Sequence, residues 1–458
     1  MTATRPAPSS VARRARGAVF ALFFTNGALF ANLVPRYPEV KDTFDLSDPA
    51  YGATIALFPL GAVCAGPLAA WVIRRFSSAR TATLGTVCIG VALSVVGMVT
   101  VWRASIDEGG PGSATLAYVL FAVTFFLGGA SDSITDVGQN AHGLRVQRLY
   151  GRSIINSFHG GWSLGAVTGG LMGSAAVGLG IPLGWHLLGA AVVFIVVGAG
   201  ALRFALPGTD EPGSPGMPAR APGVDGPGAI GPVTAVTPGT AAEVATPGAA
   251  DAPVDTEVGH VSTRRWPWLM VITALTVLAI SGTAVEDVIS TWSTLYMRDF
   301  LGVHAGFAGL PFVTMLVSQT VGRLGGDRVI DALGMRRTIQ FGGVLVVVGT
   351  GLAAAVPAVW TMLVGMVLAG LGCAAIVPVA MNAADDIPGM RAGVGLTVVT
   401  WLMRLSFLLG PPLVGLLVEA TTLRSAVVVL PVAGAVTLVA ASVLAPSPRG
   451  ASRDGARE

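Results

Sequence analysis

The chain has 458 residues, of which 53% are hydrophobic and only 12% are charged, with a formal net charge of +3. A soluble domain usually carries about 25% charged residues, so this composition excludes an ordinary soluble enzyme. Twelve membrane spans of about 20 to 24 residues each fit within the chain with loops to spare. The composition therefore predicts a polytopic membrane protein that uses no nucleic acid as a partner.

Twelve apolar runs are long enough to cross a bilayer as helices. In lipid every backbone amide must be satisfied within its own segment, so helix is the structure expected for such runs. The six runs of the first half are 17–35, 50–73, 82–102, 114–140, 153–180 and 184–205. The six runs of the second half are 267–295, 305–323, 338–356, 359–383, 392–418 and 425–445.

The arrangement of the runs predicts two six-helix bundles, at 17–205 and 266–446, with tails at 1–16 and 447–458. The stretch 206–265 between them is dominated by Pro, Gly, Ala and Thr, which predicts a disordered cytoplasmic loop.

Basic residues predict the orientation of these helices. With the N-terminus inside, 22 of the 28 basic residues lie in cytoplasmic segments, five lie in outer loops, and Arg404 falls within a span. This bias predicts that both tails are cytoplasmic. A cleaved signal peptide is the competing interpretation of the first run, but its removal would leave eleven spans and spoil the charge asymmetry.

The two halves share an internal repeat. Gly66, Leu68 and Arg80 align with Gly322, Leu324 and Arg336 at a constant offset of 256 residues. Each copy follows the second span of its half, where a duplicated six-helix unit would place it.

The second copy resembles the signature loop of the major facilitator superfamily of secondary transporters. The first copy departs from that pattern, with Trp71 where an acidic residue is expected and Ser78 where a glycine is expected. The resemblance implies a loop that latches the inner gate. Its residues here are Gly66, Arg74, Arg75, Arg80, Gly322, Arg323, Asp327, Arg328, Arg336 and Arg337.

A narrower resemblance covers most of the chain. The segments FTNGALFANLVPRYPEVKD, TDVGQNAHGLRVQRLYGRSIINSFHGGWSLG, EDVISTWSTLYMRDFLG and FLLGPPLVGLLVEATTLRSA are similar to the fucose-permease-like branch, and especially to its YbjJ-type inner membrane proteins. The resemblance implies a multi-pass protein of a bacterial inner membrane. It also implies that Asp136, in the fourth span, is the acid linked to proton coupling.

The residues of the fourth span lead to the same position independently. Asp132, Asp136 and Asn140 recur every four residues, so they share one helix face, with Gln139 beside them. A carboxylate near mid-bilayer costs roughly 2.5 to 3.5 kcal/mol, which predicts that this face borders a polar cavity. The alternative is that Asp136 lies near the cytoplasmic surface, where it is hydrated and serves helix packing.

His159 is predicted to lie at the depth of Asp136, because the two residues are equally far from the middle of the hairpin between the fourth and fifth spans. The hypothesis is that Asp136, Asp132 and His159 form the proton-coupling group. The alternative is a structural histidine that is satisfied by a backbone carbonyl.

Candidate solute-binding residues come from several spans. Glu286 and Trp292 lie on the seventh span at a spacing that suits a polyhydroxy ligand, although an interfacial aromatic belt has the same appearance. Arg404, near the centre of the eleventh span, needs an anionic partner such as Glu286 or an anionic group on the solute. Asn140 is a further candidate, although amides also hold helices together. Weaker candidates are Asn26, Arg36, Asn382 and Asp385.

The expected function is secondary active transport of a small polar solute, either sugar-like or a small organic anion, by alternating access with protons. A drug or metabolite exporter that exchanges protons is the runner-up, and a non-transporting membrane sensor is less favoured. The GxSxG motif at Gly161–Gly165 follows no strand, so it predicts helix packing rather than an enzyme. We expect a monomer with no cofactor and no metal.

Overall fold

The computed structural model describes residues 9–106, 111–150, 153–208, 210, 267–385, 387, 390 and 393–444. All regular structure within these ranges is helical, which confirms the predicted all-α class. The predicted tail at 447–458, residues 1–8 of the N-terminal tail, and residues 211–265 of the predicted central loop lie outside the described residues.

The chain divides into two compact units. The first unit is Met1–Asp45 with Leu57–Pro238, and the second is Leu46–Ala56 with Gly239–Glu458. The sequence places the whole second run, 50–73, in the first bundle, whereas the structure groups the outer part of this run with the second unit. The predicted outer limits of the two bundles stay predictions.

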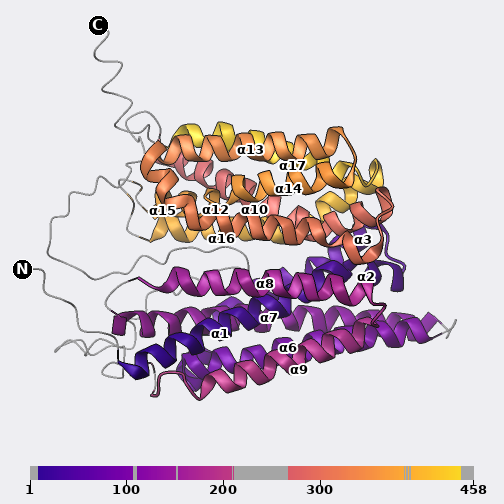
Figure 1. Ribbon diagram of the computed structural model, residues 1–458, viewed down its shortest axis with the longest axis horizontal. Helices are drawn as coiled ribbons and strands as arrows, with labels where there is room; N and C mark the ends of the chain where they lie inside the picture. Colours follow the sequence, from indigo (N-terminus) through magenta and orange to yellow (C-terminus); the bar gives the residue numbers. More distant parts are fainter. Residues whose placement is uncertain are drawn as a thin grey trace, which may run out of the picture. The chain divides into compact units, whose positions relative to one another are not determined.

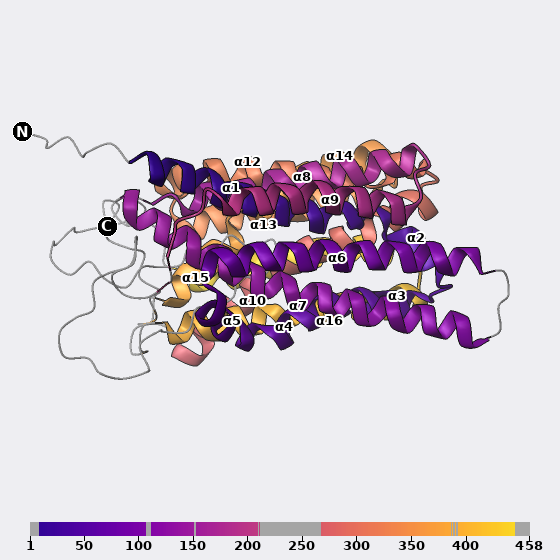
Figure 2. The ribbon, with the colours of Figure 1, turned by 90° about the horizontal axis from the view of Figure 1, so that it is seen from below.

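The first unit contains five long helices and several short ones (Figure 1). Its elements are α1 (Ser10–Leu33), η1 (Val34–Arg36), α2 (Tyr37–Thr43), α4 (Leu57–Ala65), η2 (Gly66–Leu68), α5 (Ala69–Phe76), α6 (Ser78–Ser105), α7 (Pro111–Tyr150), α8 (Ile155–Gly178) and α9 (Leu183–Leu202). α1 packs along α8, and α6 packs against both α7 and α9 (Figures 1 and 2).

The second unit is organised around α10 and α16. Its elements are α3 (Asp48–Ile55), α10 (Trp268–Leu295), η3 (Tyr296–Phe300), α11 (Ala305–Ala308), α12 (Leu310–Leu333), α13 (Met335–Ala355), α14 (Val359–Cys373), α15 (Ile376–Asp385), α16 (Val394–Ala420), α17 (Ser425–Ala440) and η4 (Ala441–Val443). α10 packs on α16 and α17, and the short helix α3 packs on α16.

Among the described residues, eleven helices are long and apolar enough to cross a membrane. They match eleven of the twelve predicted runs. The remaining run, 153–180, forms the 24-residue helix α8, which is rich in glycine and carries Asn156 and His159 near its start. The fold is therefore that of a multi-pass membrane protein with two helical units, while the cytoplasmic placement of both tails stays a prediction.

Glycines allow α1 and α8 to approach closely. A Cβ added at Gly27 would clash with the Trp162 carbonyl oxygen, and one added at Gly165 would clash with the Phe24 carbonyl oxygen. Small residues serve such contacts in membranes, because hydrocarbon supplies no hydrophobic force between helices. The glycines of the GxSxG motif therefore belong to helix packing, as predicted.

This packing makes a direct prediction. Gly165→Ala should lower the stability of the first unit by about 1–3 kcal/mol or more, since the obstacle is backbone rather than a flexible side chain. Gly160→Ala, on the same helix, is the matched control, because a Cβ there meets nothing within 4 Å. Thermal denaturation of the detergent-solubilised protein measures both, and equal midpoints for the two variants would contradict the packing argument.

Candidate functional site

A polar face of α7 forms the candidate site of the first unit. Asp132 is fully buried, at 0% exposure. The polar side chain that interacts with its carboxyl is the neutral amide of Asn26, on α1. Gln139 is tied to α1 by a 2.9 Å hydrogen bond from its amide nitrogen to the Leu22 carbonyl oxygen. The face predicted from four-residue spacing therefore exists, and α1 covers it.

Asp136 is held differently from Asp132. The Asn140 amide nitrogen donates to the Asp136 carboxylate at 2.9 Å and to the Asp136 carbonyl oxygen at 2.9 Å. Asp136 and Asn140 were predicted to share one helix face, and in the structure their side chains are in direct contact. The ring of His159 packs edge-on against Phe23, with the ring centroids 5.1 Å apart. Titration of Asp136 with His159 as a coupled pair stays a prediction.

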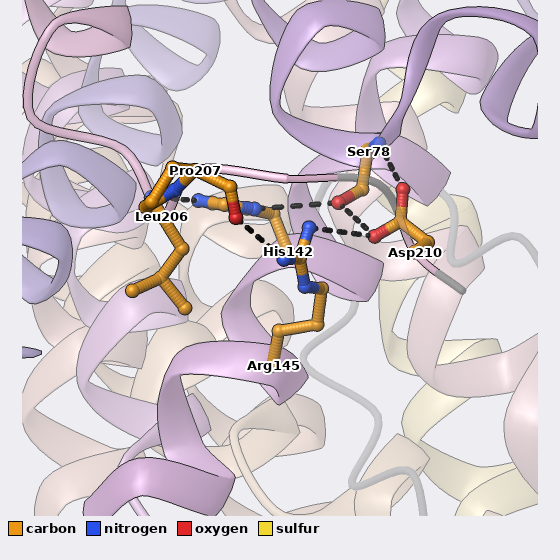
Figure 3. Close-up of polar contacts among 6 residues, drawn as sticks. All are labelled: Ser78, His142, Arg145, Leu206, Pro207 and Asp210. Carbon is orange, nitrogen blue, oxygen red and sulfur yellow. Dashed lines mark hydrogen bonds and ion pairs between the residues drawn. The ribbon is translucent and has the colours of Figure 1, made fainter. Parts of the chain in front are cut away.

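A second cluster of polar side chains lies at the cytoplasmic side predicted for the first unit (Figure 3). The Asp210 carboxylate accepts from the Ser78 backbone amide at 2.6 Å, from the Ser78 hydroxyl at 2.6 Å and from Arg145 at 3.0 Å. Arg145 also donates to the Pro207 carbonyl oxygen at 3.2 Å, although this side chain is 1% exposed. These contacts fasten the segment after α9 to the start of α6 and the end of α7.

His142 completes this cluster and fixes its protonation pattern. Its Nε2 accepts from the Leu206 amide at 3.3 Å, so Nδ1 carries the proton and faces the Ser78 hydroxyl at 3.3 Å (Figure 3). The serine hydroxyl then donates to Asp210. In a hydrolytic triad the histidine lies between the serine and the acid and accepts the serine proton. Here the serine lies in the middle, so the cluster is a structural tie.

The second unit contains a largely buried ion pair between the second half of α10 and α12. Arg323 of α12 lies 3.2 Å from the Glu286 carboxylate, and the Gln319 amide also donates to that carboxylate. The Gln319 amide nitrogen lies 3.5 Å from the Cys373 sulfur of α14. The sequence places Arg323 in a gate loop, whereas the structure places it within α12 as the counter-ion of Glu286. The predicted need of Arg404 for an anionic partner, either a protein carboxylate or a group on the solute, stays a prediction.

Other predicted solute residues lie in packed surroundings. Trp292 is 1% exposed, and its ring meets Tyr51 edge-on at 5.1 Å between centroids. Arg36 is 2% exposed and donates to Glu39 at 3.0 Å and to the Ile181 carbonyl oxygen at 2.6 Å. These contacts account for Trp292 and Arg36 structurally, and their roles in binding stay predictions.

Asn382 and Arg404 are both half-buried, on α15 and α16 respectively. Their predicted contacts with solute stay untested. Asp385, at the end of α15, accepts from the Gly393 amide at 2.7 Å and thereby joins α15 to the start of α16.

The two motif copies form helical turns rather than long loops. A single residue separates the helices in each copy: Ser77 between α5 and α6, with φ 72° and ψ 157°, and Gly334 between α12 and α13, with φ 80° and ψ 157°. The sequence pairs Ser78 with the signature glycine, but the backbone pairs Ser77 with it. The arginines Arg74, Arg75, Arg80, Arg328 and Arg337 are exposed, as is Asp327, while Arg336 is half-buried.

This conformation is one that only glycine adopts readily, and for other residues it costs on the order of 1–3 kcal/mol. Ser77→Gly should therefore raise the thermal midpoint of the detergent-solubilised protein. The reciprocal change, Gly334→Ser, places the same strain in the second copy and should lower the midpoint. A stabilising effect of Gly334→Ser would contradict the assignment.

No group of three or more His, Cys, Asp or Glu side chains that could hold a metal ion occurs within the described ranges. The candidate sites are instead built from single carboxylates and amides on helices.

Comparison with known proteins yields matches along most of the chain. A family model described as Major Facilitator Superfamily matches residues 19–326 and 275–458. An uncharacterized MFS-type transporter of Yersinia pestis is 22% identical over 406 residues, which cover 88% of this chain and 89% of that protein. The membrane protein MosC of Rhizobium meliloti is 24% identical over 418 residues, which cover 91% of this chain and 87% of that protein.

A solved structure has a similar fold at low sequence identity. It is a bacterial homolog of the human lysosomal transporter Spinster, in an inward-facing and unoccupied conformation. The TM-score is 0.62 at 13% identity, and the match covers 97% of this chain and all of that one. This likeness supports the all-helical, multi-pass fold alone.

Proposed function

The chain belongs to the major facilitator superfamily, and we propose that it carries a small polar solute by alternating access in exchange for, or together with, protons. It is a transporter by family and a multi-pass membrane protein, rather than an enzyme. The resemblance to the fucose-permease-like branch remains a prediction, as do the solute and the coupling ion.

The proposal rests on the complete burial of the Asp132 carboxyl without a cationic partner among the described residues. An ionised carboxylate without a cationic partner in a helical bundle is strongly disfavoured, so the group must be neutral there or reach water at another stage of the cycle. Asp132 is completely buried, and the polar side chain beside it is the neutral amide of Asn26 rather than a cation. A carboxyl that takes up a proton in one state and releases it in another supplies proton coupling. Asp132 thus has a stronger claim than Asp136, which Asn140 already satisfies in part.

The surrounding amides favour a solute rich in hydroxyl groups. The amide nitrogens of Gln139 and Asn140 are committed to protein oxygens, which leaves the amide oxygens of both residues buried and without a partner. The amide oxygen of Asn26 is likewise buried without a hydrogen-bond partner among the described residues. These groups accept hydrogen bonds, so they match a solute that donates, such as a neutral polyol or sugar, better than an organic anion.

Uptake into proteoliposomes tests the proposal. The purified protein is reconstituted, and accumulation of labelled hexoses, pentoses, polyols, small carboxylates and amines is measured with and without an imposed pH gradient. We expect a neutral polyhydroxy solute to accumulate only when the gradient is present. Gradient-independent equilibration of every transported solute would refute proton coupling, and selective transport of carboxylates would refute the solute class.

A further inference from the structure

Asp287 of α10 carries a buried carboxyl group that the proposed coupling mechanism does not use. The residue is 7% exposed, and its Oδ2 atom is buried without a hydrogen-bond partner among the described residues. We infer that Asp287 is a second proton-binding site, within the second unit, and that it holds its proton while α3 is packed on α10 and α16. This inference extends the proposed function, since it assigns the second unit a proton of its own.

The Asp287 carboxyl packs against Gly410 of α16. A Cβ added at Gly410 would lie 2.5 Å from the Asp287 Oδ2 atom, so the carboxyl occupies the space that a side chain would fill. Pro411 and Pro412 follow within the same helix. Proline has no N–H group, so the carbonyls of Phe407 and Leu408 lose their usual donors within the helix. A neutral carboxyl is a hydrogen-bond donor, whereas a carboxylate only accepts.

The charges around Asp287 also favour a neutral group. Its neighbour in the chain is Glu286, and the positive charge close to this acid pair is that of Arg323, which is paired with Glu286. The titratable or charged side chains on the elements that pack against α10 are Arg323, Asp327, Arg328 and Asp331 on α12, Asp385 on α15, Arg404 and Glu419 on α16, Cys373 on α14, and Tyr296, Arg298 and Asp299 on η3. The helix α17 contributes none. The charged and titratable side chains of α3, which packs on α16, are Asp48 and Tyr51.

The same turn of α16 also packs against α3. A Cβ at Gly52 would clash with the carbonyl oxygen of Pro411, the residue directly after Gly410. The Tyr51 hydroxyl donates to the Thr291 carbonyl oxygen at 2.6 Å, one helical turn beyond Asp287 on α10. A charge on Asp287 would have to draw water into this contact region. Loss of the proton should therefore weaken the packing of α3 on α10 and α16.

The surroundings of the Asp287 carboxyl suit a bound proton better than a metal cation. Hard cations need several oxygen ligands at once, typically six or more for calcium and magnesium. The described residues contain no group of three acidic or other metal-binding side chains, and the space at Gly410 is already filled by the carboxyl oxygen. Occupancy by sodium is retained as an outcome of the test.

Infrared difference spectroscopy detects the protonated carboxyl directly. The full-length protein in liposomes is titrated with pH in the absence of sodium, in H₂O and in D₂O, as wild type, Asp287→Asn and the double variant Glu286→Gln/Arg323→Met, which removes both charges of the neighbouring ion pair. We expect a carboxylic C=O band, sensitive to deuteration, that is lost in Asp287→Asn and kept in the double variant. An unchanged band in Asp287→Asn would overturn the site, and loss of the wild-type band on adding sodium chloride at constant pH would reassign it to sodium.

Alkylation of a buried cysteine tests the link to α3. Thr54→Cys, at a position with 0% exposure, is the reporter, and Ala53→Cys, at an exposed position of the same helix, is the control. Both are made with the exposed Cys64 and Cys88 changed to serine. The alkylation rate of the reporter by an impermeant maleimide, relative to the control, should rise severalfold with pH and stay low in Asp287→Asn. A pH-independent ratio in the wild-type background would refute the link.

Neither readout uses a transported solute. A failure of the transport proposal and a failure of the Asp287 site would therefore appear as separate results.

Discussion

Asp132→Asn should abolish accumulation of solute driven by a pH gradient. The asparagine mimics the neutral carboxyl, so it preserves the packing of the buried face but cannot release a proton. We expect gradient-driven uptake to fall by about tenfold or more, equivalent to at least 1.4 kcal/mol in the driving step. Exchange of labelled for unlabelled solute, which needs no net proton movement, should persist. Proteoliposome uptake and counterflow measure the two activities side by side.

Two variants on the same helix serve as controls for Asp132→Asn. Ser131→Ala removes an exposed hydroxyl that donates to the Leu127 carbonyl oxygen of its own helix, and it should leave both activities unchanged. Asp136→Asn should have a smaller effect than Asp132→Asn, because Asn140 already satisfies part of that carboxylate. Full gradient-driven accumulation by Asp132→Asn would remove this residue from the coupling mechanism.

The ion pair between Glu286 and Arg323 should dominate the stability of the second unit. Removing one partner of a buried pair leaves an uncompensated charge and typically costs about 3–5 kcal/mol. Glu286→Gln keeps the hydrogen-bonding shape but removes the negative charge that pairs with Arg323, while Arg323→Met removes the counter-ion of Glu286 beside Asp287. Both single variants should unfold at much lower temperature than wild type in detergent.

The double variant Glu286→Gln/Arg323→Met separates pairing from simple loss of contacts. With both charges gone, we expect most of the stability to return, because no buried charge remains without a partner. Additive losses in the double variant would show that the two residues act independently. Arg404→Met is a useful comparison, because Arg404 is not the partner of Glu286 and its loss should leave the Glu286→Gln effect unchanged.

Sequence reasoning was most successful where a pattern is local. The apolar runs predicted the long helices, since chain length and backbone satisfaction in lipid leave little choice. Four-residue spacing correctly placed Asp136 and Asn140 on one face, where they now form a hydrogen bond. Spacing could not show that Asp132 is completely buried while Asn140 holds Asp136, because that depends on how α1 covers the face.

Contacts between distant segments account for what was missed. The cluster at Asp210 joins Ser78, His142 and Arg145 across as many as 132 residues of chain, and a lone histidine at a helix end gives no signal of such a network. The weak signal available was a single acid, Asp210, soon after the apolar run that forms α9. The pairing of Arg323 with Glu286 was missed for a related reason, since the motif resemblance assigned that arginine to a loop.

The repeat alignment misplaced, by one residue, the position of the first copy that is equivalent to Gly334. A constant offset of residue types paired Ser78 with the signature glycine, whereas the backbone conformation pairs Ser77 with Gly334. Side-chain identity is a poor guide where the shared feature is a positive φ that serine adopts only under strain.

We propose that solute movement is tied to proton movement through the buried carboxyl of Asp132. The most direct measurement is the internal pH of wild-type proteoliposomes, followed with an entrapped pH-sensitive dye, when the transported solute is added without any imposed gradient. We expect a solute-dependent change in internal pH that a protonophore abolishes. Proteoliposomes with the Asp132→Asn variant should show no such change. In wild-type proteoliposomes, solute uptake at full rate with no change in internal pH would contradict this proposal.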